Sequence, residues 1–196
     1  MRVLVINVGS ATVKMSVTDT GSGEQVFKAE LPVRDGGVGS IAKMLQRAEI
    51  AEIDAIGHRV VHGGEVFREP TLIDDGVMVA LESLSPLAPL HNPPALAGIR
   101  AARKQWPDVP QVAVFDTAFH STMPNRATTY AVPEEWRRTG VRRFGFHGTS
   151  HKYVMERAAG ALGVSHRDLR IISCHLGNGA SVCAIDRGSP STPRGE

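Results

Sequence analysis

Polar residues that could bind an anion gather near the N-terminus of the 196-residue chain, between two short apolar runs. They are Asn7, Gly9, Ser10, Thr12 and Lys14. Two β-branched runs around a Gly/Ser turn predict a β-hairpin with these residues at its tip. Backbone N–H groups in such a tip can form an anion-binding concavity, and lysine adds a point charge. The tip is therefore a candidate phosphate site, although the same residues would also suit an ordinary turn.

A second stretch of the same kind spans residues 168–188, DLRIISCHLGNGASVCAIDRG, and again predicts strand, Gly-rich turn and strand. When Gly9 is set against Gly177, with one extra residue in the second turn, the sequence Ala-Thr-Val at 11–13 aligns with Ala-Ser-Val at 180–182. A repeat this short could arise by chance. If it is genuine, the chain holds two related hairpins, one per domain, each offering backbone donors to a phosphate.

Other charged side chains come at or near the ends of apolar runs. Arg59 and His62 lie near the end of a β-rich run over residues 53–65, and Asp116 directly follows QVAVF at 111–115. Ligands gather at the carboxyl ends of strands in open α/β sheets, so these groups are candidates for one site. Arg59 could instead be only an ion-pair partner, and Asp116 only a strand-end cap. A zinc ion shared by His58 and His62 is the weaker interpretation, because both lie on a predicted strand.

The elements that must position these residues follow from periodicity. Residues 25–33 predict a third strand, and helices are predicted from Ser40 as cap, over 77–84, and from the cap-like Asn92-Pro93 pair to about residue 105. A last helix is predicted after Ser150, with Val154, Ala158 and Ala161 on one face and Gly163 closing it. Three strands followed by alternating helices and strands favour an α/β fold with a mixed sheet and crossover helices.

Composition excludes several classes of protein. A hydrophobic content of 42%, a charged content of 21% and a net charge of +2 are typical of a globular protein and give no case for nucleic acid or a membrane surface as partner. The sequence shows neither a membrane span nor a signal peptide, so we expect a cytoplasmic protein. Cys174 and Cys183 are expected to be buried small hydrophobes. His120, His151 and His166 are interpreted as hydrogen-bonding or solvated histidines.

Taken together, these stretches resemble the acetate kinase family, within the superfamily of actin, sugar kinases and heat-shock chaperone ATPases. The matching segments are VLVINVGSATVK, GHRVVHGGE, PLAPLHNPP, VAVFDTAFHSTMP, RRFGFHGTSHKYV and HLGNGASVCAI. They occur in family order and span residues 1 to about 188. The resemblance implies a ribonuclease-H-like (actin-like ATPase) α/β fold. It also implies a first domain over 1–118 and the beginning of a second over 119–196, each with one phosphate hairpin.

The resemblance implies reversible transfer of the ATP γ-phosphoryl group to the carboxylate of acetate, giving acetyl phosphate and ADP, with Mg²⁺. Such chemistry asks a protein mainly for positioning and for positive charge around the transferring group. The implied catalytic residues are Asp116, His147 and Arg59. The implied acetate-binding residues are Arg59, Val61, Leu90, His91 and Phe146. The implied phosphate-binding residues are Asn7, Ser10, Thr12, Lys14, His175, Gly177, Asn178 and Gly179, and Asn7 is also a candidate magnesium ligand.

Several departures from the family pattern bear on this expectation. Thr12 stands where the family more often has serine, the segment before His58 is shorter than usual, and residues 189–196 diverge. Family members are homodimers of about twice this length, and most of their nucleotide-binding domain and dimer interface lies beyond the matched part. The chain could therefore be part of a split or truncated kinase, an inactive module that holds acetate or acetyl phosphate, or a relative acting on propionate or butyrate.

Overall fold

A computed structural model describes residues 1–9, 12–32, 37–50, 52–177 and 179–194. Two residues of the predicted phosphate loops, Ser10 and Asn178, lie outside the described residues. The chain forms two compact units, which we describe one at a time. Unit 1 comprises Met1–His62 and Pro70–Val114, and unit 2 comprises Gly63–Glu69 and Phe115–Glu196. The domain boundary expected near residue 118 stays a prediction.

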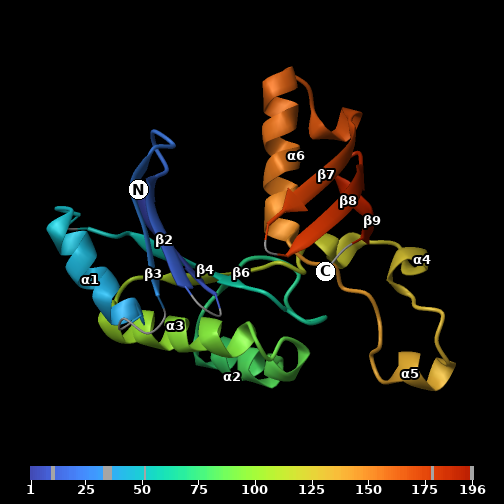
Figure 1. Cartoon of the computed structure of the whole chain (residues 1–196), viewed down its shortest axis with the longest axis horizontal. Helices are drawn as coiled ribbons and strands as arrows, with labels where there is room; N and C mark the ends of the chain where they lie inside the picture. Colours follow the sequence, from blue (N-terminus) through green and yellow to red (C-terminus); the bar gives the residue numbers. More distant parts are fainter. Residues whose placement is uncertain (10–11, 33–36, 51, 178, 195–196) are drawn as a thin grey trace. The chain divides into compact units, whose positions relative to one another are not determined.

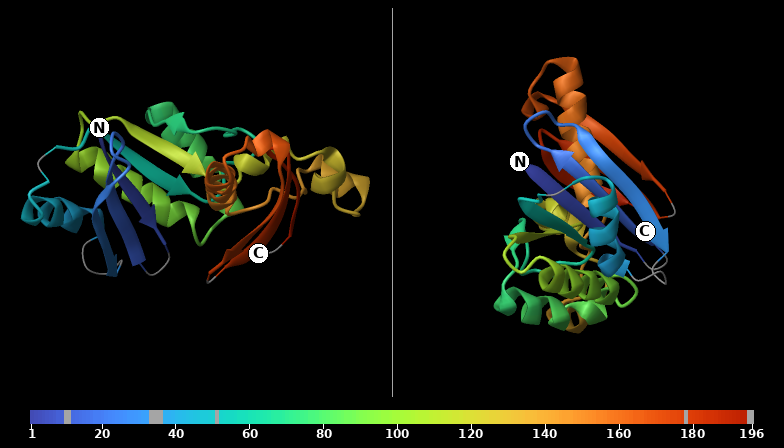
Figure 2. Two further views of the ribbon diagram at one scale, coloured as in Figure 1. Left: turned by 90° about the horizontal axis from the view of Figure 1, so that it is seen from above. Right: turned by 90° about the vertical axis from the view of Figure 1, so that its left-hand side faces the viewer.

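Unit 1 is built on a mixed sheet in the order β3-β2-β1-β4-β6-β5 (Figure 1). The strands are β1 (Arg2–Val8), β2 (Thr12–Asp19), β3 (Gln25–Pro32), β4 (Ala55–Val60), β5 (Thr71–Leu72) and β6 (Gln111–Phe115). The first three strands pair antiparallel, as the two hairpin patterns predicted, and β1 pairs with β4 in parallel. Figure 2 shows this sheet from two further directions, together with the helices packed on it. The expectation of a mixed sheet with crossover helices is confirmed.

The core of unit 1 lies on the face of the sheet formed by alternate residues of the first hairpin. Leu4 and Ile6 of β1 are buried with Val13, Met15 and Val17 of β2. Two helices supply the opposing side chains: Ile41 and Leu45 come from α1 (Gly37–Arg47), and Ala102 comes from α3 (Asn92–Gln105). Each buried side chain of this size contributes roughly 1.5–3 kcal/mol, so this face holds unit 1 together.

Two helix starts differ from the sequence prediction. The helix α1 begins at Gly37 and not after Ser40, because burial of Ile41 and Leu45 outweighs the poor helix propensity of glycine. The N-cap of α3 is His91 and not Asn92. The Asn92 side chain is fully buried and is used elsewhere, as described below.

Asp74 is the N-cap of the helix α2 (Asp75–Ser83), and its carboxylate accepts a hydrogen bond from the Val77 backbone N–H at 2.7 Å. We expect Asp74→Ala to lower the free energy of unfolding of unit 1 by about 1 kcal/mol, because one N–H of the first turn loses its acceptor. Urea unfolding measures this loss. Asp74→Asn keeps a side-chain oxygen at the same place, so it should lose at most a few tenths of a kcal/mol; an equal loss in both variants would contradict a capping role.

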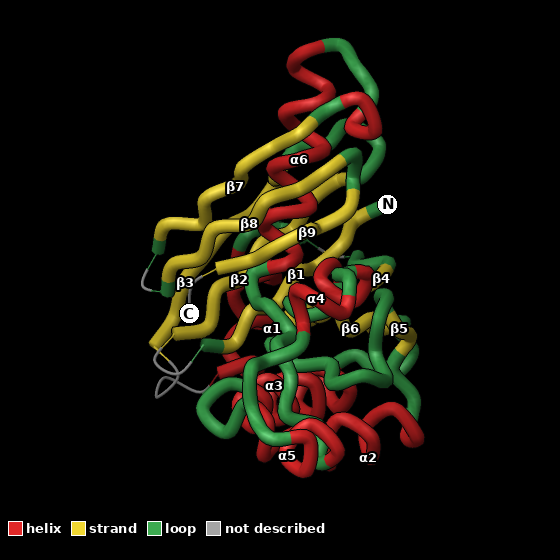
Figure 3. The backbone as a smooth tube through the Cα atoms, turned by 90° about the vertical axis from the view of Figure 1, so that its right-hand side faces the viewer, coloured by secondary structure: helices red, strands yellow, loops and turns green. Residues whose placement is uncertain are grey.

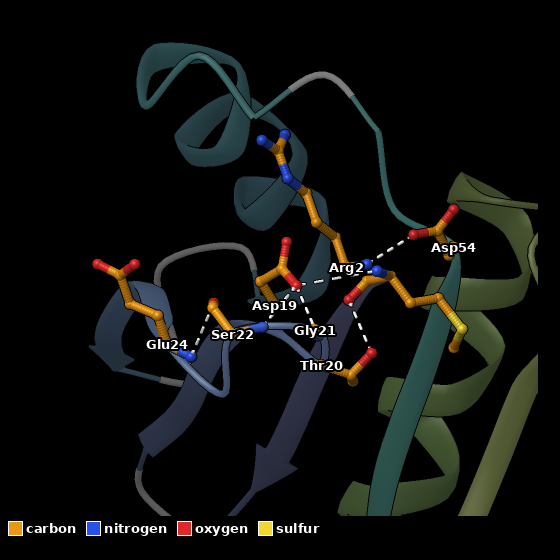
Figure 4. A network of polar contacts seen from close by, with 8 residues as sticks. Arg2, Asp19, Thr20, Gly21, Ser22, Glu24 and Asp54 are labelled. Atoms are coloured by element: carbon orange, nitrogen blue, oxygen red, sulfur yellow. Dashed lines mark hydrogen bonds and ion pairs between the residues drawn. The ribbon is translucent and has the colours of Figure 1, made fainter.

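Polar side chains close the end of the sheet away from the predicted phosphate tip (Figure 4). Asp19 accepts hydrogen bonds from the backbone N–H groups of Gly21 at 2.7 Å and Ser22 at 3.4 Å, and these bonds hold the pKa of its carboxyl below the usual value. The Arg2 backbone N–H donates to the Asp54 carboxylate. These groups satisfy turn and strand-end hydrogen bonds, which accounts for their presence without a ligand.

Unit 2 contains an antiparallel sheet in the order β7-β8-β9 beside the long helix α6 (Figure 3). The elements are β7 (Arg170–Leu176), β8 (Ala180–Asp186), β9 (Ser189–Arg194) and α6 (Gly148–Leu162). Met155 of α6 packs with Cys183 and Ile185 of β8 to form the core. Shorter helical turns are η1 (Ser85–Leu87) in unit 1, and η2 (Phe119–Thr122), α4 (Asn125–Thr128), α5 (Glu134–Arg138) and η3 (His166–Asp168) in unit 2.

The predicted face of α6 was wrong. His147 and not Ser150 is the N-cap, and the buried stripe is His151, Met155 and Ala159, whereas Val154 is 42% exposed. A histidine takes a core position here because serine hydroxyls of the sheet satisfy both of its ring nitrogens. The predicted end at Gly163 is confirmed, with a left-handed φ of 67°.

Two further expectations for unit 2 are corrected. Strand β9 was not predicted, because its two prolines argue against a strand; it lies at an edge of the sheet, where proline is tolerated. Cys174 is exposed, because β7 turns alternate residues away from α6, while Cys183 is buried as expected and burial raises its pKa to about 11.

Candidate functional site

Asn7 and Arg59 lie side by side in unit 1 because they leave two neighbouring parallel strands at their carboxyl ends. Ile6 of β1 is paired with His58 of β4, so the next residue of each strand falls at the same level. Arg59 Nη1 lies 3.4 Å from Asn7 Oδ1, within hydrogen-bond distance. The alternate residues His58 and Val60 are buried, which turns Arg59 to the sheet face away from the core. This edge is where open α/β sheets bind ligands.

Lys14 and Thr12 of β2 belong to the same face. Lys14 is the cross-strand partner of Asn7, and its Nζ lies 3.9 Å from a carboxylate oxygen of Glu30. Both partners of this ion pair are more than half exposed, so the pair contributes little and leaves the lysine available for a stronger anion. The Gly9 backbone N–H donates to the Thr12 carbonyl at 2.8 Å, which closes the turn. Unit 1 thus brings together Asn7, Thr12, Lys14 and Arg59.

The predicted acetate-binding residues of unit 1 flank a buried amide. Asn92 Oδ1 accepts from the His62 backbone N–H at 3.1 Å, and Asn92 Nδ2 donates to the His62 carbonyl at 3.0 Å. This pair of bonds joins the segment after β4, which carries Val61, to the start of α3, which follows Leu90 and His91. Val61 is half-buried, while Leu90 is 71% exposed and His91 is exposed. Sequence reasoning missed Asn92 as a positioning residue and took it for a helix cap.

Asp116 in unit 2 is almost fully buried, at 1% exposure, and is held by the start of α6. Its carboxylate accepts a hydrogen bond from the Thr149 hydroxyl at 2.8 Å, and its backbone carbonyl accepts from the Gly148 N–H at 2.9 Å. The next residue, Thr117, accepts from the Gly63 backbone N–H at 3.0 Å. The end of β6, the start of α6 and the segment 63–69 are therefore joined at Asp116.

His147 has a backbone conformation that non-glycine residues seldom adopt, with φ at 56°. Such outliers are often found where a side chain is held for function. Its ring stacks on that of His175, with centroids 4.1 Å apart and an interplanar angle of 15°. It also lies against the second turn, because a Cβ placed on Gly179 would be 3.4 Å from His147 Cε1 and 3.5 Å from Nε2. Unit 2 thus brings together His147, His175 and Gly179, while the Gly177 N–H donates to the Gly179 carbonyl.

The remaining predicted residue of unit 2 is Phe146, which is half-buried and whose carbonyl oxygen lies 2.9 Å from His120 Nε2. His120 is buried, and burial lowers its pKa. His120 and His151 are therefore hydrogen-bonding histidines and not solvated ones, which were the two possibilities given by the sequence. The predicted apolar pocket draws Val61 and Leu90 from unit 1 and Phe146 from unit 2, and it stays a prediction.

Metal ligation has little support among the described residues. No group of three or more His, Cys, Asp or Glu side chains there could hold a metal ion. His58, considered for zinc with His62, is buried and its Nε2 lies 2.8 Å from Gln111 Oε1, an arrangement that accounts for it as a core histidine.

In the described ranges, no helix is long and apolar enough to cross a membrane.

Comparison with known proteins gives the family of this chain. The sequence profile of the Acetokinase family matches residues 21–192. The chain belongs to the acetokinase family. Relatives include the acetate kinase of Thermotoga maritima, 46% identical over 220 residues, which cover 96% of this chain and 55% of the relative. The acetate kinase of Pseudarthrobacter chlorophenolicus is 47% identical over 208 residues, covering 96% and 54%.

Solved structures agree with this membership of the acetokinase family. The crystal structure of Porphyromonas gingivalis acetate kinase superposes with a TM-score of 0.86 at 38% identity, covering 98% of this chain and 56% of that one. A propionate kinase from Francisella tularensis gives a TM-score of 0.88 at 35% identity, with the same coverages. The predicted α/β fold class is confirmed by these likenesses. The chain spans about half the length of the relatives it matches.

Proposed function

We propose that this chain carries the acetate-binding residues of an acetate kinase-type phosphotransferase. Such an enzyme reversibly transfers the γ-phosphoryl group of ATP to the carboxylate of acetate. The observation that carries the proposal is the pairing of Arg59 with Asn7 at the carboxyl ends of two parallel strands, in a chain of the acetokinase family. A guanidinium in that position offers a planar pair of donors that matches a carboxylate or a phosphoryl group.

Each side chain then has a defined task. Arg59 binds the carboxylate of acetate, and the turn after Asn7, with Thr12 and Lys14, binds phosphate oxygens. His147 donates a hydrogen bond to the transferring phosphoryl group. Asp116 orients His147, because it accepts hydrogen bonds from Thr149 and Gly148 at the start of α6, directly after His147. Positioning and electrostatic stabilisation of this kind are what phosphoryl transfer requires of a protein.

Magnesium enters the proposal as an ion that ATP brings with it. The described residues do not form a cage for Mg²⁺, and the oxygen of Asn7 faces the positive guanidinium of Arg59 at 3.4 Å, which makes it a poor first ligand. Among the three proposed catalytic residues, Asp116, His147 and Arg59, only Asp116 carries a carboxylate.

Arg59→Ala tests the proposal. We expect the affinity for acetyl phosphate, measured by calorimetry, and any acetyl phosphate formation from ATP, Mg²⁺ and acetate, trapped as the hydroxamate, to fall by roughly 10- to 100-fold. That range corresponds to the 1.5–3 kcal/mol of a hydrogen bond to a charged group. Arg100→Ala is the matched control, because Arg100 is an exposed arginine of unit 1 that pairs with Glu82. Unchanged binding and turnover in Arg59→Ala would sink the assignment of Arg59.

A second candidate function is a binding module that holds acetate or acetyl phosphate without completing catalysis. It is favoured by the placement of Arg59, Asn7 and Lys14, which would bind a carboxylate or a phosphate, together within unit 1. Acetyl phosphate binding that depends on Arg59, without ATP-dependent turnover, would favour this binding module over the kinase. The likeness to a propionate kinase makes propionate and butyrate the acids to compare, where one methylene is worth about 1–3 kcal/mol.

A further inference from the structure

A buried chain of alternating hydroxyls and imidazoles runs behind His147 in unit 2. Ser173 Oγ lies 2.9 Å from His151 Nδ1, and His151 Nε2 lies 2.9 Å from Ser181 Oγ. Ser181 Oγ lies in turn 2.9 Å from His147 Nδ1. Ser173, His151 and Ser181 are 3%, 0% and 4% exposed, so protein groups and not bulk water satisfy their polar atoms.

The sheet and helix of unit 2 place this chain. Cys183 is the cross-strand partner of Ser173, and His175 is the partner of Ser181, so the two serines are diagonal neighbours on the inward face of β7 and β8. His151 comes from the buried stripe of α6 and reaches both hydroxyls. Its own backbone N–H donates to the His147 carbonyl at 3.0 Å, which holds the two histidines on successive turns.

The number of protons available decides which atom donates and which accepts in each of these hydrogen bonds. A neutral imidazole has one donor and one acceptor nitrogen, and a serine hydroxyl has one proton, so Ser181 donates to one of its two histidines and accepts from the other. At the end of the series away from His147, the hydrogen-bond partner of the Ser173 hydroxyl among the described residues is His151 Nδ1. A buried O–H without an acceptor costs about 1–3 kcal/mol, so Ser173 donates to His151 Nδ1.

The rest of the order follows from that first bond. His151 then carries its proton on Nε2 and donates it to Ser181, and Ser181 donates to His147 Nδ1. This order requires a neutral His151. Burial, with the nearby charges of His120 and then His147, lowers the pKa of His151 to about 4, so the ring stays neutral near pH 7.

We propose that the chain Ser173–His151–Ser181 fixes His147 as the tautomer with its proton on Nε2, pointing a hydrogen-bond donor at the turn that contains Gly177 and Gly179. The inference rests on the proposed function in one respect, namely that the acceptor at this turn is a phosphoryl oxygen. The opposite tautomer would present a lone pair to that oxygen and repel it. Ser181 and His151 are thereby positioning residues, which act through His147 and do not touch the substrate.

Nitrogen NMR of the histidine rings tests the tautomer directly, on the whole chain with ¹⁵N-labelled histidine and no substrate. We expect His147 to show an unprotonated Nδ1 and a protonated Nε2 near neutral pH. Ser181→Ala should remove this pattern and give a mixture of both tautomers. Ser150→Ala is the matched control, because its hydroxyl bonds to Nδ1 of the stacked His175, so it should leave the His147 pattern intact.

Two results would overturn the proposal: a wild-type His147 protonated on Nδ1, or an unchanged single tautomer in Ser181→Ala. The wild-type spectrum decides the matter even if Ser181→Ala fails to fold, and the signals of His120, which is hydrogen-bonded to the Phe146 carbonyl in the same unit, report separately on the folding of unit 2. The NMR experiment contains no ATP or acetate, so it is independent of the activity assay. Absence of turnover in that assay would count against the proposed function and leave the tautomer result unaffected. Turnover by a protein whose His147 is protonated on Nδ1 would support the proposed function and contradict the tautomer.

Discussion

Replacing Gly148 with alanine should destabilise unit 2 by about 3 kcal/mol, the upper end of the range typical of an overpacked core. A Cβ at this position would lie 2.3 Å from the Asp116 carbonyl oxygen and 2.9 Å from Phe119 Cβ. Neither atom is the end of a flexible side chain, so the backbone itself must move. The first turn of α6 would shift away from Asp116 and break the hydrogen bonds that Gly148 and Thr149 make to it.

Gly160→Ala in the same helix is the control, and it should have the opposite sign. A Cβ on Gly160 would meet no atom within 4 Å, so alanine should stabilise α6 by roughly 0.5–1 kcal/mol through its higher helix propensity. Urea unfolding followed by circular dichroism, with hydrogen exchange of α6 to assign the change to unit 2, measures both variants. A loss below about 1 kcal/mol in Gly148→Ala would contradict the close approach described above.

Acidification should be the second large effect, because the buried histidines His58 and His62 of unit 1 and His120 and His151 of unit 2 all have a pKa lowered by burial. Burial lowers the pKa of His58 and of His151 from 6.5 to about 4. In the unfolded chain these rings take up protons as the pH falls through 6.5, whereas in the folded chain they stay neutral until about pH 4. Stability is therefore full above pH 6.5 and declines below it, by about 2 kcal/mol per histidine between about pH 7 and pH 5.

His58 and His151 lie in different units, so each unit should lose stability separately. The free energy of unfolding of each unit, measured in urea at a series of pH values, should fall with a slope equivalent to at least about one proton over this range. His58→Gln should lower the slope of unit 1 and His151→Gln that of unit 2, each leaving the other unit unchanged, while His62 and His120 supply the slope that remains. Stability that does not vary between pH 7 and pH 5 would rule out neutral buried rings.

Much of the fold could be predicted because period-2 alternation marks strands that bury one face. The first hairpin, β3 and the β7–β8 pair were predicted from strand patterns of this kind, while β6 was indicated by its apolar composition. The alternation fails for β9, whose prolines give no strand signal although an edge position tolerates them. It also fails for Cys174, because nothing in the pattern tells which face of β7 a helix will cover.

The candidate site could be predicted only as far as its types of residue carry chemistry by themselves. Arg59 and Asp116 were named as candidates because they come near the ends of apolar runs, and His147 was named only through the resemblance to the family. The residues that hold these three side chains in the structure were not predicted. Asn92 was interpreted as a cap because Asn-Pro commonly starts a helix, whereas its amide is used to join two loops. His151 and Ser181 carry no distinctive spacing, and only the packing of α6 on the sheet brings them into line.

The segment 63–69 imposes an order on the assembly of this chain during its synthesis. It belongs to unit 2, yet it leaves the ribosome before the second part of unit 1 has been made. Its partners come late: Phe67 stacks on Phe115, and the Gly63 N–H bonds to Thr117, 54 residues further along the chain. Unit 1 can thus close while 63–69 is still a solvated loop with an unmatched phenylalanine. We therefore expect completion of unit 2 to be the late step of folding.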